Sequence, residues 1–275
     1  MGKIDRLGWA AGLSFEAFGL KIGIRVSDPL SLDAFVARIP AGWTLLDSRV
    51  VDRLYSVVTP TLRKRHHRKL CILYGDDARL IRTEKFQDLL DGFESDLDLY
   101  VAANCERPLF VHAGAIRWRQ NVILLPGPSR SGKTSLVAEF LRAGASYYSD
   151  DFAPIERDGH IHPYQRPLSV RLESGGIQRL DPEDLGAQPA EPASASLVLF
   201  TQYAHGASWL PQRVSHGQAV LRMLQNTPGA RKRPSLAIEV LGHALKNAEI
   251  HVGFRGEKAD TVERVIDYLD HWSSQ

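Results

Sequence analysis

Residues 127–134 constrain this chain more than any other segment, because they spell the pattern Gly-x-x-x-x-Gly-Lys-Thr. The apolar run 122–125 before the pattern predicts a short buried strand, and residues 134–142 after it predict a helix. A strand, a glycine-bounded turn and a helix form a loop whose backbone N–H groups converge on phosphate oxygens. We call residues 127–134 the glycine loop, and the alternative to phosphate binding is a chance glycine turn with an exposed lysine.

Each residue type in the glycine loop suits one task. Gly127 and Gly132 let the backbone curl, Lys133 offers a mobile cation for the β- and γ-phosphates of a nucleotide, and the Thr134 hydroxyl can bind Mg²⁺. The helix that begins at Lys133 directs its positive end at the same place. The residues expected to bind the nucleotide are Gly127, Ser129, Arg130, Ser131, Gly132, Lys133, Thr134 and Ser135.

Two adjacent carboxylates, Asp150 and Asp151, follow the next predicted strand, residues 146–148. The later apolar run 197–200 ends in Thr201 and Gln202 and offers no carboxylate. In an α/β sheet, the strand before the aspartates would end at the same edge as the glycine loop. Two carboxylates there suit two tasks, one on Mg²⁺ and one on a substrate proton. The alternative is an Asx turn at the start of a loop.

The pattern of predicted strands and helices changes near residue 105. This change predicts that the chain folds into two units. Residues 1–105 predict a small α/β unit, with extended segments at 14–27 and 50–58, a hairpin around residues 75–77 and a long amphipathic helix over 84–103. Residues 106–275 predict a second domain around the glycine loop. Its expected elements include a hairpin at 155–161, a Pro- and Ala-rich loop at 182–194 and helices at 215–225, 234–246 and 258–271.

Composition narrows the function classes. Hydrophobic residues make up 44% and charged residues 24%, as in ordinary globular proteins, and the net charge of +2 is too small to indicate a nucleic-acid-binding protein. No apolar run approaches the roughly 20 residues that span a bilayer. Cys71 and Cys105 lack metal-ligand spacing, so a reducing, cytoplasmic location is expected. The basic run 63–69 predicts either a solvated loop or a contact for an acidic peptide or nucleic acid, without aromatic residues for base stacking.

The run Val111-His112-Ala113-Gly114, the strand 122–126, the glycine loop and the two aspartates together resemble a known family. They are similar to the C-terminal kinase domain of the HPr serine kinase/phosphorylase family, which shares its fold group with phosphoenolpyruvate carboxykinase. The resemblance is strongest over residues 108–173. It implies a P-loop core with a mixed sheet and an ATP- and Mg²⁺-dependent kinase. The closest likeness is to HPr-kinase-related proteins found with peptide-maturation genes, some of which phosphorylate a serine of a ribosomally made precursor peptide, as in lasso-peptide tailoring.

The resemblance also implies roles for single residues. Asp150 corresponds to the base on the acceptor serine, Asp151 and Thr134 to the Mg²⁺ ligands, and His112 to a residue that assists the base. The sequence alone cannot orient adjacent side chains, so the roles of the two aspartates can be exchanged. Beyond the pair, Arg166 or Arg171 is either a group that neutralises the transferred phosphoryl or a surface arginine, and Arg171 is taken as the catalytic candidate.

The chain departs from true HPr kinases at three places. Ser135 replaces the usual glutamate, Pro128 and Arg130 replace a glycine-rich loop interior, and the HPr-recognition signature is not evident. HPr itself is therefore not the expected acceptor. The sequence predicts a kinase of a serine-type hydroxyl on a peptide or protein, with no membrane partner and an open oligomeric state. The alternatives are a small-molecule hydroxyl kinase and a nucleotide-dependent binding or regulatory module.

Overall fold

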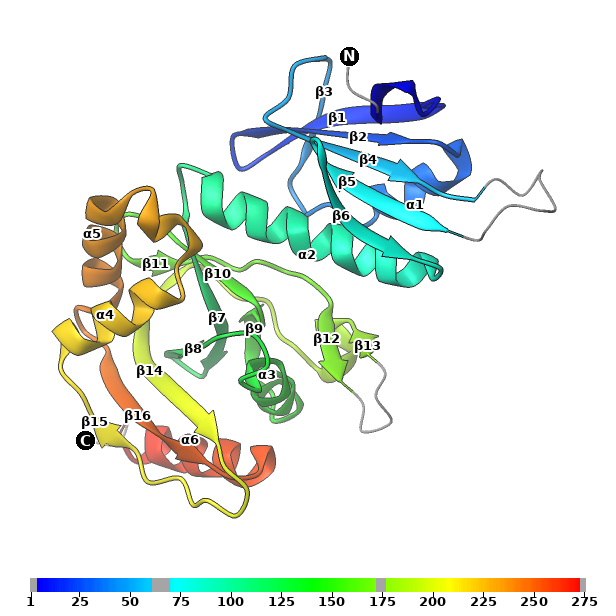
Figure 1. Ribbon diagram of the computed structural model, residues 1–275. Helices are drawn as coiled ribbons and strands as arrows, with labels where there is room; N and C mark the ends of the chain where they lie inside the picture. Colours follow the sequence, from blue (N-terminus) through cyan, green and yellow to red (C-terminus); the bar gives the residue numbers. More distant parts are fainter. Residues whose placement is uncertain (1–3, 61–69, 172–176, 273–275) are drawn as a thin grey trace. The chain divides into compact units, whose positions relative to one another are not determined.

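The computed structural model describes residues 4–60, 70–171 and 177–272 and is a mixed α/β protein (Figure 1). The chain divides into two compact units between Arg107 and Pro108, two residues beyond the boundary expected from the sequence. The basic run 63–69 lies outside the described residues. None of the helices in the described ranges combines the length and the apolar character needed to cross a bilayer.

The first unit is a six-stranded sheet, in the order β3-β1-β2-β4-β5-β6, with one long helix against it (Figure 1). Its strands are β1 (Ala11–Ala17), β2 (Leu20–Val26), β3 (Thr44–Leu46), β4 (Arg53–Val58), β5 (Cys71–Gly75) and β6 (Ala78–Thr83). Its helices are α1 (Leu32–Val36) and α2 (Phe86–Asn104), with short 3₁₀ turns at Ile4–Arg6 and Pro29–Ser31. The expected hairpin around residues 75–77 and the expected long helix are both confirmed.

Aromatic side chains join α2 to the sheet of the first unit. The Phe93 ring on α2 meets Tyr55 of β4 edge to face at 4.9 Å between centroids, and Phe35 of α1 at 5.2 Å. All three rings are fully buried. The expected extended segment 14–27 is in fact a hairpin, because Phe18 and Gly19 take positive φ and turn the chain between β1 and β2.

The second unit is built on an eight-stranded mixed sheet, in the order β11-β10-β7-β8-β14-β16-β15, with β9 also paired to β7. Its central strands are β7 (Leu109–Trp118), β8 (Asn121–Pro126), β14 (Ala193–Tyr203) and β16 (Glu249–Arg255). The others are β9 (Ser146–Ser149), β10 (Phe152–Ile155), β11 (His160–Ile161) and β15 (Gln212–Arg213), and a separate pair is formed by β12 (Leu168–Arg171) and β13 (Ile177–Leu180).

Helices cover both faces of this sheet. On one face α3 (Lys133–Arg142) and α6 (Lys258–Trp272) pack in a core with Leu125, Phe140 and Leu197, among others. On the other, α4 (His216–Gln225) and α5 (Pro234–Leu245) pack in a core with Val111 and Val198, among others (Figure 1). Short 3₁₀ helices occupy Pro182–Leu185 and Pro228–Arg231, so the expected loop 182–194 contains one turn of helix and the start of β14.

Strand directions bring distant segments to one edge of this sheet. β14 runs parallel to both β8 and β16, and β9 runs antiparallel to β7, which is itself antiparallel to β8. The ends of β8, β9, β14 and β16 therefore lie at the same edge. Two features follow strands at this edge: the glycine loop follows β8, and the acidic pair (Asp150 and Asp151) follows β9. Two residues end strands there: Tyr203 ends β14, and Arg255 ends β16.

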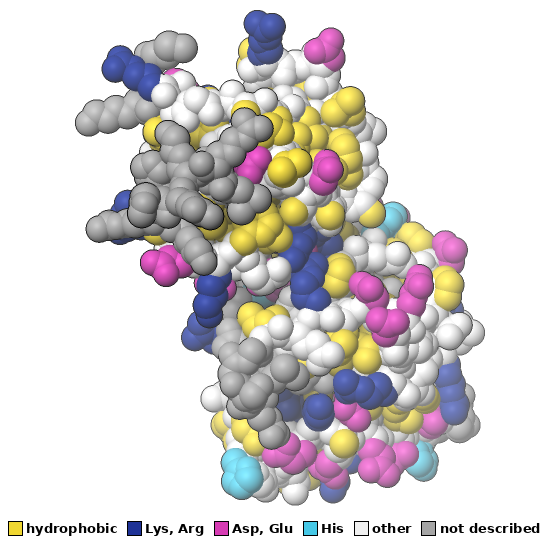
Figure 2. Space-filling view, turned by 90° about the vertical axis from the view of Figure 1, so that its right-hand side faces the viewer, with side chains coloured by type: hydrophobic (Ala, Val, Ile, Leu, Met, Phe, Trp, Pro, Cys, Tyr) yellow, Lys and Arg dark blue, Asp and Glu magenta, His cyan; other side chains and the backbone are white. Residues whose placement is uncertain are grey.

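Charged side chains of both signs are interspersed over the visible face in Figure 2, in keeping with the small net charge of +2. Both cysteines of the first unit, Cys71 and Cys105, are buried thiols outside any disulfide, and burial raises the pKa of Cys71. Since the thiolate is the reactive form of cysteine, this environment makes Cys71 a packing residue.

Candidate functional site

The glycine loop joins the end of β8 to the start of α3 through a left-handed turn. Gly132 has φ +87° and Arg130 has φ +69°. A Cβ at position 132 would also lie 2.0 Å from Arg255 Nη2, so only glycine fits there. No side chain caps the N-terminus of α3. The backbone N–H groups of its first turn are therefore available to an anion bound in the glycine loop.

Lys133 folds back over the glycine loop. Its side chain is 7% exposed, and Nζ donates to the carbonyl oxygens of Gly127 at 2.9 Å and Pro128 at 3.0 Å. Burial lowers the pKa of Lys133, and the charges of Asp151 and Asp150 oppose that shift. The ammonium is thus held by neutral oxygens, which a phosphate oxygen can replace without breaking an ion pair.

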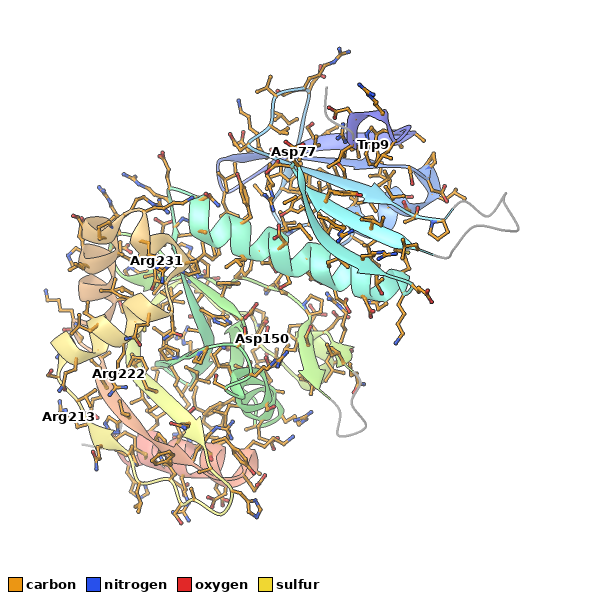
Figure 3. The ribbon with its side chains drawn as sticks, in the orientation of Figure 1. Trp9, Asp77, Asp150, Arg213, Arg222 and Arg231 are labelled. Atoms are coloured by element: carbon orange, nitrogen blue, oxygen red, sulfur yellow. The ribbon has the colours of Figure 1, made fainter. Side chains whose placement is uncertain are left out.

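Asp150 is the buried member of the acidic pair (Figure 3). It is 6% exposed, the Tyr147 hydroxyl lies 3.0 Å from its Oδ1, and the Thr134 hydroxyl is its second hydrogen-bond partner. Burial and the charge of Asp151 raise the pKa of Asp150 to about 6, against the opposing effect of these two hydrogen bonds. The loop hydroxyl that was expected to bind a metal with Asp151 therefore contacts Asp150.

Asp151 is the exposed member, with 59% of its side chain accessible, and it carries the contact to His112. His112 Nε2 lies 2.6 Å from Asp151 Oδ1, whereas the resemblance implies that His112 assists Asp150. The same nitrogen lies 3.3 Å from Lys133 Nζ. If His112 Nε2 carries a proton directed at the Asp151 carboxylate, it has no lone pair to accept a hydrogen bond from the Lys133 ammonium. The contact with Asp151 is the shorter of the two, which indicates that His112 donates to Asp151.

A single peptide unit of β7 ties the two halves of the site together. The carbonyl oxygen of His112 accepts from Gly127 N at 3.2 Å, at the start of the glycine loop. The N–H of Ala113, in the same peptide unit, donates to the carbonyl oxygen of Asp151 at 3.0 Å. The loop and the acidic pair are therefore positioned by the same piece of backbone.

The two arginines considered after the acidic pair lie differently. Arg171 ends β12, and its side chain is outside the described part of the structure. Arg166 is half-buried, and its carbonyl oxygen accepts from the Tyr147 hydroxyl at 3.0 Å. Arg166 and Tyr147 also line a cavity of about 380 Å³ with Gln165, Gln188 and the acidic residues Asp181, Glu183 and Asp184. This cavity lies next to the Tyr147–Asp150 contact.

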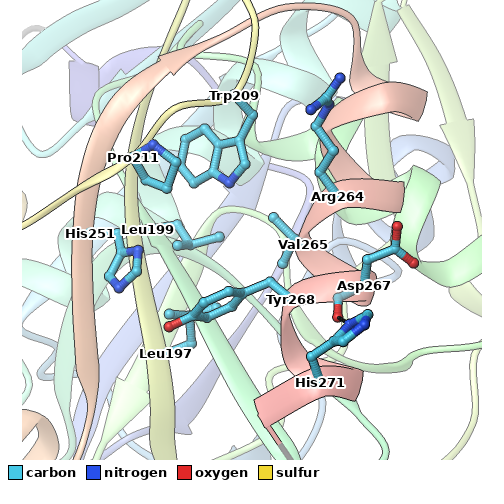
Figure 4. Close-up of a pocket in the computed structure, with 10 residues that line it drawn as sticks. All are labelled: Leu197, Leu199, Trp209, Pro211, His251, Arg264, Val265, Asp267, Tyr268 and His271. Carbon is cyan, nitrogen blue, oxygen red and sulfur yellow. Dashed lines mark hydrogen bonds between the residues drawn. The ribbon is translucent and has the colours of Figure 1, made fainter.

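A second cavity of about 380 Å³ lies farther along the same unit, under α6 (Figure 4). Leu197 and Leu199 of β14 form its apolar wall, and Trp209, His251 and Tyr268 surround it. Its walls come from β14, β16, α6 and the segment 209–211, so it is separate from the glycine loop.

Arg255 is a site residue that the sequence analysis missed. It ends β16, it is 4% exposed, and its Nη2 lies 3.4 Å from the carbonyl oxygen of Ser131 and 3.5 Å from that of Gly132. Burial lowers the pKa of Arg255, while Tyr203 and Glu257 oppose that shift. No strand was expected at residues 249–255, so nothing in the sequence placed this arginine beside the loop.

Asp150 and Thr134 are the pair of oxygen-bearing side chains that a metal ion bound with a nucleotide would meet beside the glycine loop. The described residues contain no cluster of three or more His, Cys, Asp or Glu side chains that could hold a metal ion. Mg²⁺ is commonly held by one or two carboxylates together with substrate phosphates. Asp150 and Thr134, which are hydrogen-bonded to each other, would supply such a smaller set of ligands if Mg²⁺ entered with a nucleotide.

The raised pKa of Asp150 gives a test of its burial. Because the pKa of Asp150 is about 6 in the folded protein, against 3.8 for an ordinary aspartic acid, the folded state holds this proton more tightly than the unfolded state. Stability should fall as pH rises from about 4 to 6, and the loss should persist above pH 6. Asp150→Asn should therefore stabilise the ligand-free protein at pH 8, by on the order of 3 kcal/mol, and much less at pH 4.

Thermal unfolding without nucleotide or divalent cation, at both pH values, measures this difference. The matched control is Asp184→Asn, an exposed carboxylate of the same unit, which should change stability little at either pH. A destabilised Asp150→Asn protein at pH 8 would contradict the argument, since it would mean that the carboxylate stabilises the fold.

Comparison with known proteins adds nothing to this geometry: no family model matches the chain, and no curated protein matches it.

Proposed function

We propose that this chain is an ATP- and Mg²⁺-dependent phosphotransferase that moves the γ-phosphoryl group to a serine-type hydroxyl of a peptide or protein. One observation carries the proposal. An uncapped helix N-terminus with a buried lysine lies against a carboxylate–histidine contact, and one peptide unit of β7 holds both. Phosphoryl transfer to an alcohol requires these two parts, a cradle for phosphates and a group that orients the hydroxyl and accepts its proton.

The proposed roles exchange the two aspartates relative to the resemblance. Asp151 is the base, because its exposed carboxylate can reach an incoming hydroxyl and His112 fixes its orientation. Asp150 is the Mg²⁺ ligand with Thr134, because the two are hydrogen-bonded beneath the loop and Asp150 is buried away from an acceptor. Bound Mg²⁺ would neutralise charge on the departing phosphates.

The chain's own residues then account for the step. Loop amides and the start of α3 hold the phosphate oxygens, and Lys133 exchanges the carbonyls of Gly127 and Pro128 for phosphate oxygens. Asp151 accepts the acceptor's proton while the acceptor oxygen bonds to the γ-phosphorus. The bond from that phosphorus to the bridging oxygen breaks, and the nucleoside diphosphate leaves with the electron pair.

The cavity beside Tyr147 favours a second candidate, a small-molecule hydroxyl kinase. Its volume of about 380 Å³ suits a small ligand, and it lies beside the Asp150 contact. Its acidic rim of Asp181, Glu183 and Asp184 would attract a positively charged acceptor, whether a metabolite or a basic peptide side chain.

Incubation with γ-labelled ATP and Mg²⁺ tests the proposal. The acceptors should be a panel of serine-containing peptides, acidic and basic, and a panel of hydroxylated metabolites. We expect label on a serine hydroxyl of a peptide, and none when the serine is replaced by alanine. Label on a metabolite alone would favour the second candidate. Nucleotide binding with no transfer to any acceptor would favour a regulatory module instead.

A further inference from the structure

The glycine loop has different neighbours on its two sides. In the sheet order, β7 with β9 and β10 lies on one side of β8 and carries the acidic pair. On the other side, β14 and β16 run parallel in register and end at Tyr203 and Arg255, which are partners in that register. Tyr203, Arg255 and the following Glu257 are not used by the step described above.

Arg255 links the loop to the Tyr203 ring. Its guanidinium reaches the carbonyl oxygens of Ser131 and Gly132 on one side. Its Cζ lies 5.3 Å from the centre of the Tyr203 ring on the other. Arg255 Nη1 also donates to the carbonyl oxygen of Gly256 at 3.1 Å, while Nε has no hydrogen-bond partner within the described part of the chain. The contacts of the guanidinium fix the ring relative to the loop.

Tyr203 is nevertheless an exposed aromatic side chain. The residue is 46% exposed, and its hydroxyl donates to Glu257 Oε1 at 2.9 Å, which fixes the ring at its far end. Glu257 holds the Tyr203 ring at its hydroxyl, and the Arg255 guanidinium lies against the ring. These contacts restrict the rotation of the side chain, although nearly half of the residue stays open to solvent. Such a ring is already organised for a planar partner, because little entropy remains to be lost when one stacks on it.

The geometry of in-line phosphoryl transfer constrains how a nucleotide lies across the glycine loop, with the acceptor on one side and the nucleoside on the other. The acceptor oxygen and the leaving oxygen stand on opposite sides of the phosphorus that moves. If the acceptor approaches from the acidic pair, on the β7 side of β8, the rest of the nucleotide leads away from it, toward β14 and β16. Tyr203 is an exposed aromatic ring at the end of β14, paired in register with Arg255.

We propose that the base of the bound nucleotide stacks on Tyr203, with Arg255 and Glu257 holding the ring in place. The inference rests on the proposed nucleotide-dependent function and names the nucleoside part of its site. Stacking tolerates every base, since each base has a π face, so the platform binds ATP and GTP alike.

The test compares two probes that share their phosphates. Calorimetry gives the Kd of Mg²⁺-ATP and of Mg²⁺-tripolyphosphate, which has no base, for the wild-type protein and for Tyr203→Ala and Tyr203→Phe. Tyr203→Ala should weaken ATP binding by roughly 5- to 100-fold, the range of one base–aromatic stack. It should leave tripolyphosphate binding unchanged, and Tyr203→Phe should retain most of the ATP affinity. GTP should lose the same factor as ATP.

Phe254→Ala is the matched control. Phe254 precedes Arg255 on the same strand and is 57% exposed, but alternation along a strand directs it to the opposite face. It should bind both probes as the wild type does. Equal losses for ATP and tripolyphosphate in Tyr203→Ala, or no loss for either, would overturn the stacking proposal while leaving the phosphate site standing. A wild-type protein that binds neither probe would refute the proposed function as well.

Discussion

Lys133→Ala is expected to abolish phosphoryl transfer, with a fall in kcat of at least 10²–10³-fold, roughly the cost of losing one preorganised group from a transition state. The ammonium sits 2.9 Å and 3.0 Å from two loop carbonyls in the ligand-free protein, ready to move onto a phosphate. Nucleotide affinity should fall too, because the lysine contacts the β- and γ-phosphates before and during transfer.

The same change should not unfold the protein. Burial without a carboxylate partner lowers the pKa of Lys133, which means that the fold holds this cation at a cost. We therefore expect the thermal stability of ligand-free Lys133→Ala to equal or exceed that of the wild type. Lys246→Ala, at the exposed end of α5, is the control for removing a lysine elsewhere. Full transfer activity in folded Lys133→Ala would eliminate the glycine loop as the phosphate site.

The two aspartates should fail in different ways when each is changed to asparagine. Asp151→Asn removes the proposed proton acceptor, so it should bind Mg²⁺-nucleotide normally and lose kcat by roughly 10²–10⁴-fold. Asp150→Asn removes a charge next to Thr134, so it should bind Mg²⁺ more weakly, need a higher Mg²⁺ concentration for transfer, and be partly rescued by high Mg²⁺. His112→Ala should resemble a milder Asp151→Asn, because His112 orients that carboxylate.

Nucleotide affinity and single-turnover transfer, each measured across a range of Mg²⁺ concentrations, separate these variants. Rescue of Asp151→Asn by Mg²⁺, with Asp150→Asn defective in transfer alone, would restore the assignment that the resemblance implies. Normal transfer by both would mean that the acidic pair is only a turn, and the kinase mechanism would be wrong.

The elements around the glycine loop were predictable because their patterns are local. The strand before the loop, the helix after it and the long helix α2 have continuous apolar runs or helical spacing. β16 was missed, since Gly253 and the charged residues at its ends, Glu249 and Arg255, break up its apolar pattern. Because this strand was not predicted, Arg255 was not predicted as a site residue either. Arg255 belongs to no sequence motif, and only the pairing of strands in the sheet brings it to the glycine loop.

The sequence also could not predict which aspartate of the acidic pair points inward and which points outward. Asp150 and Asp151 are adjacent and chemically identical, and both lie in the bend between β9 and β10. One carboxylate turns inward to Tyr147 and Thr134, and the other turns outward to His112. Sequence spacing predicted that two carboxylates would meet the glycine loop, but tertiary packing determines which one is buried and which one is exposed.

The peptide unit shared by His112 and Ala113 has a consequence for fluctuations of the native state. Its carbonyl holds the start of the glycine loop and its N–H holds the backbone of Asp151. A local opening of β7 at this point releases both halves together, so their amide hydrogens should exchange as one cooperative unit. Under the proposed function, such an opening would remove the phosphate site and the base at the same time, so that no phosphate site would persist beside a displaced base.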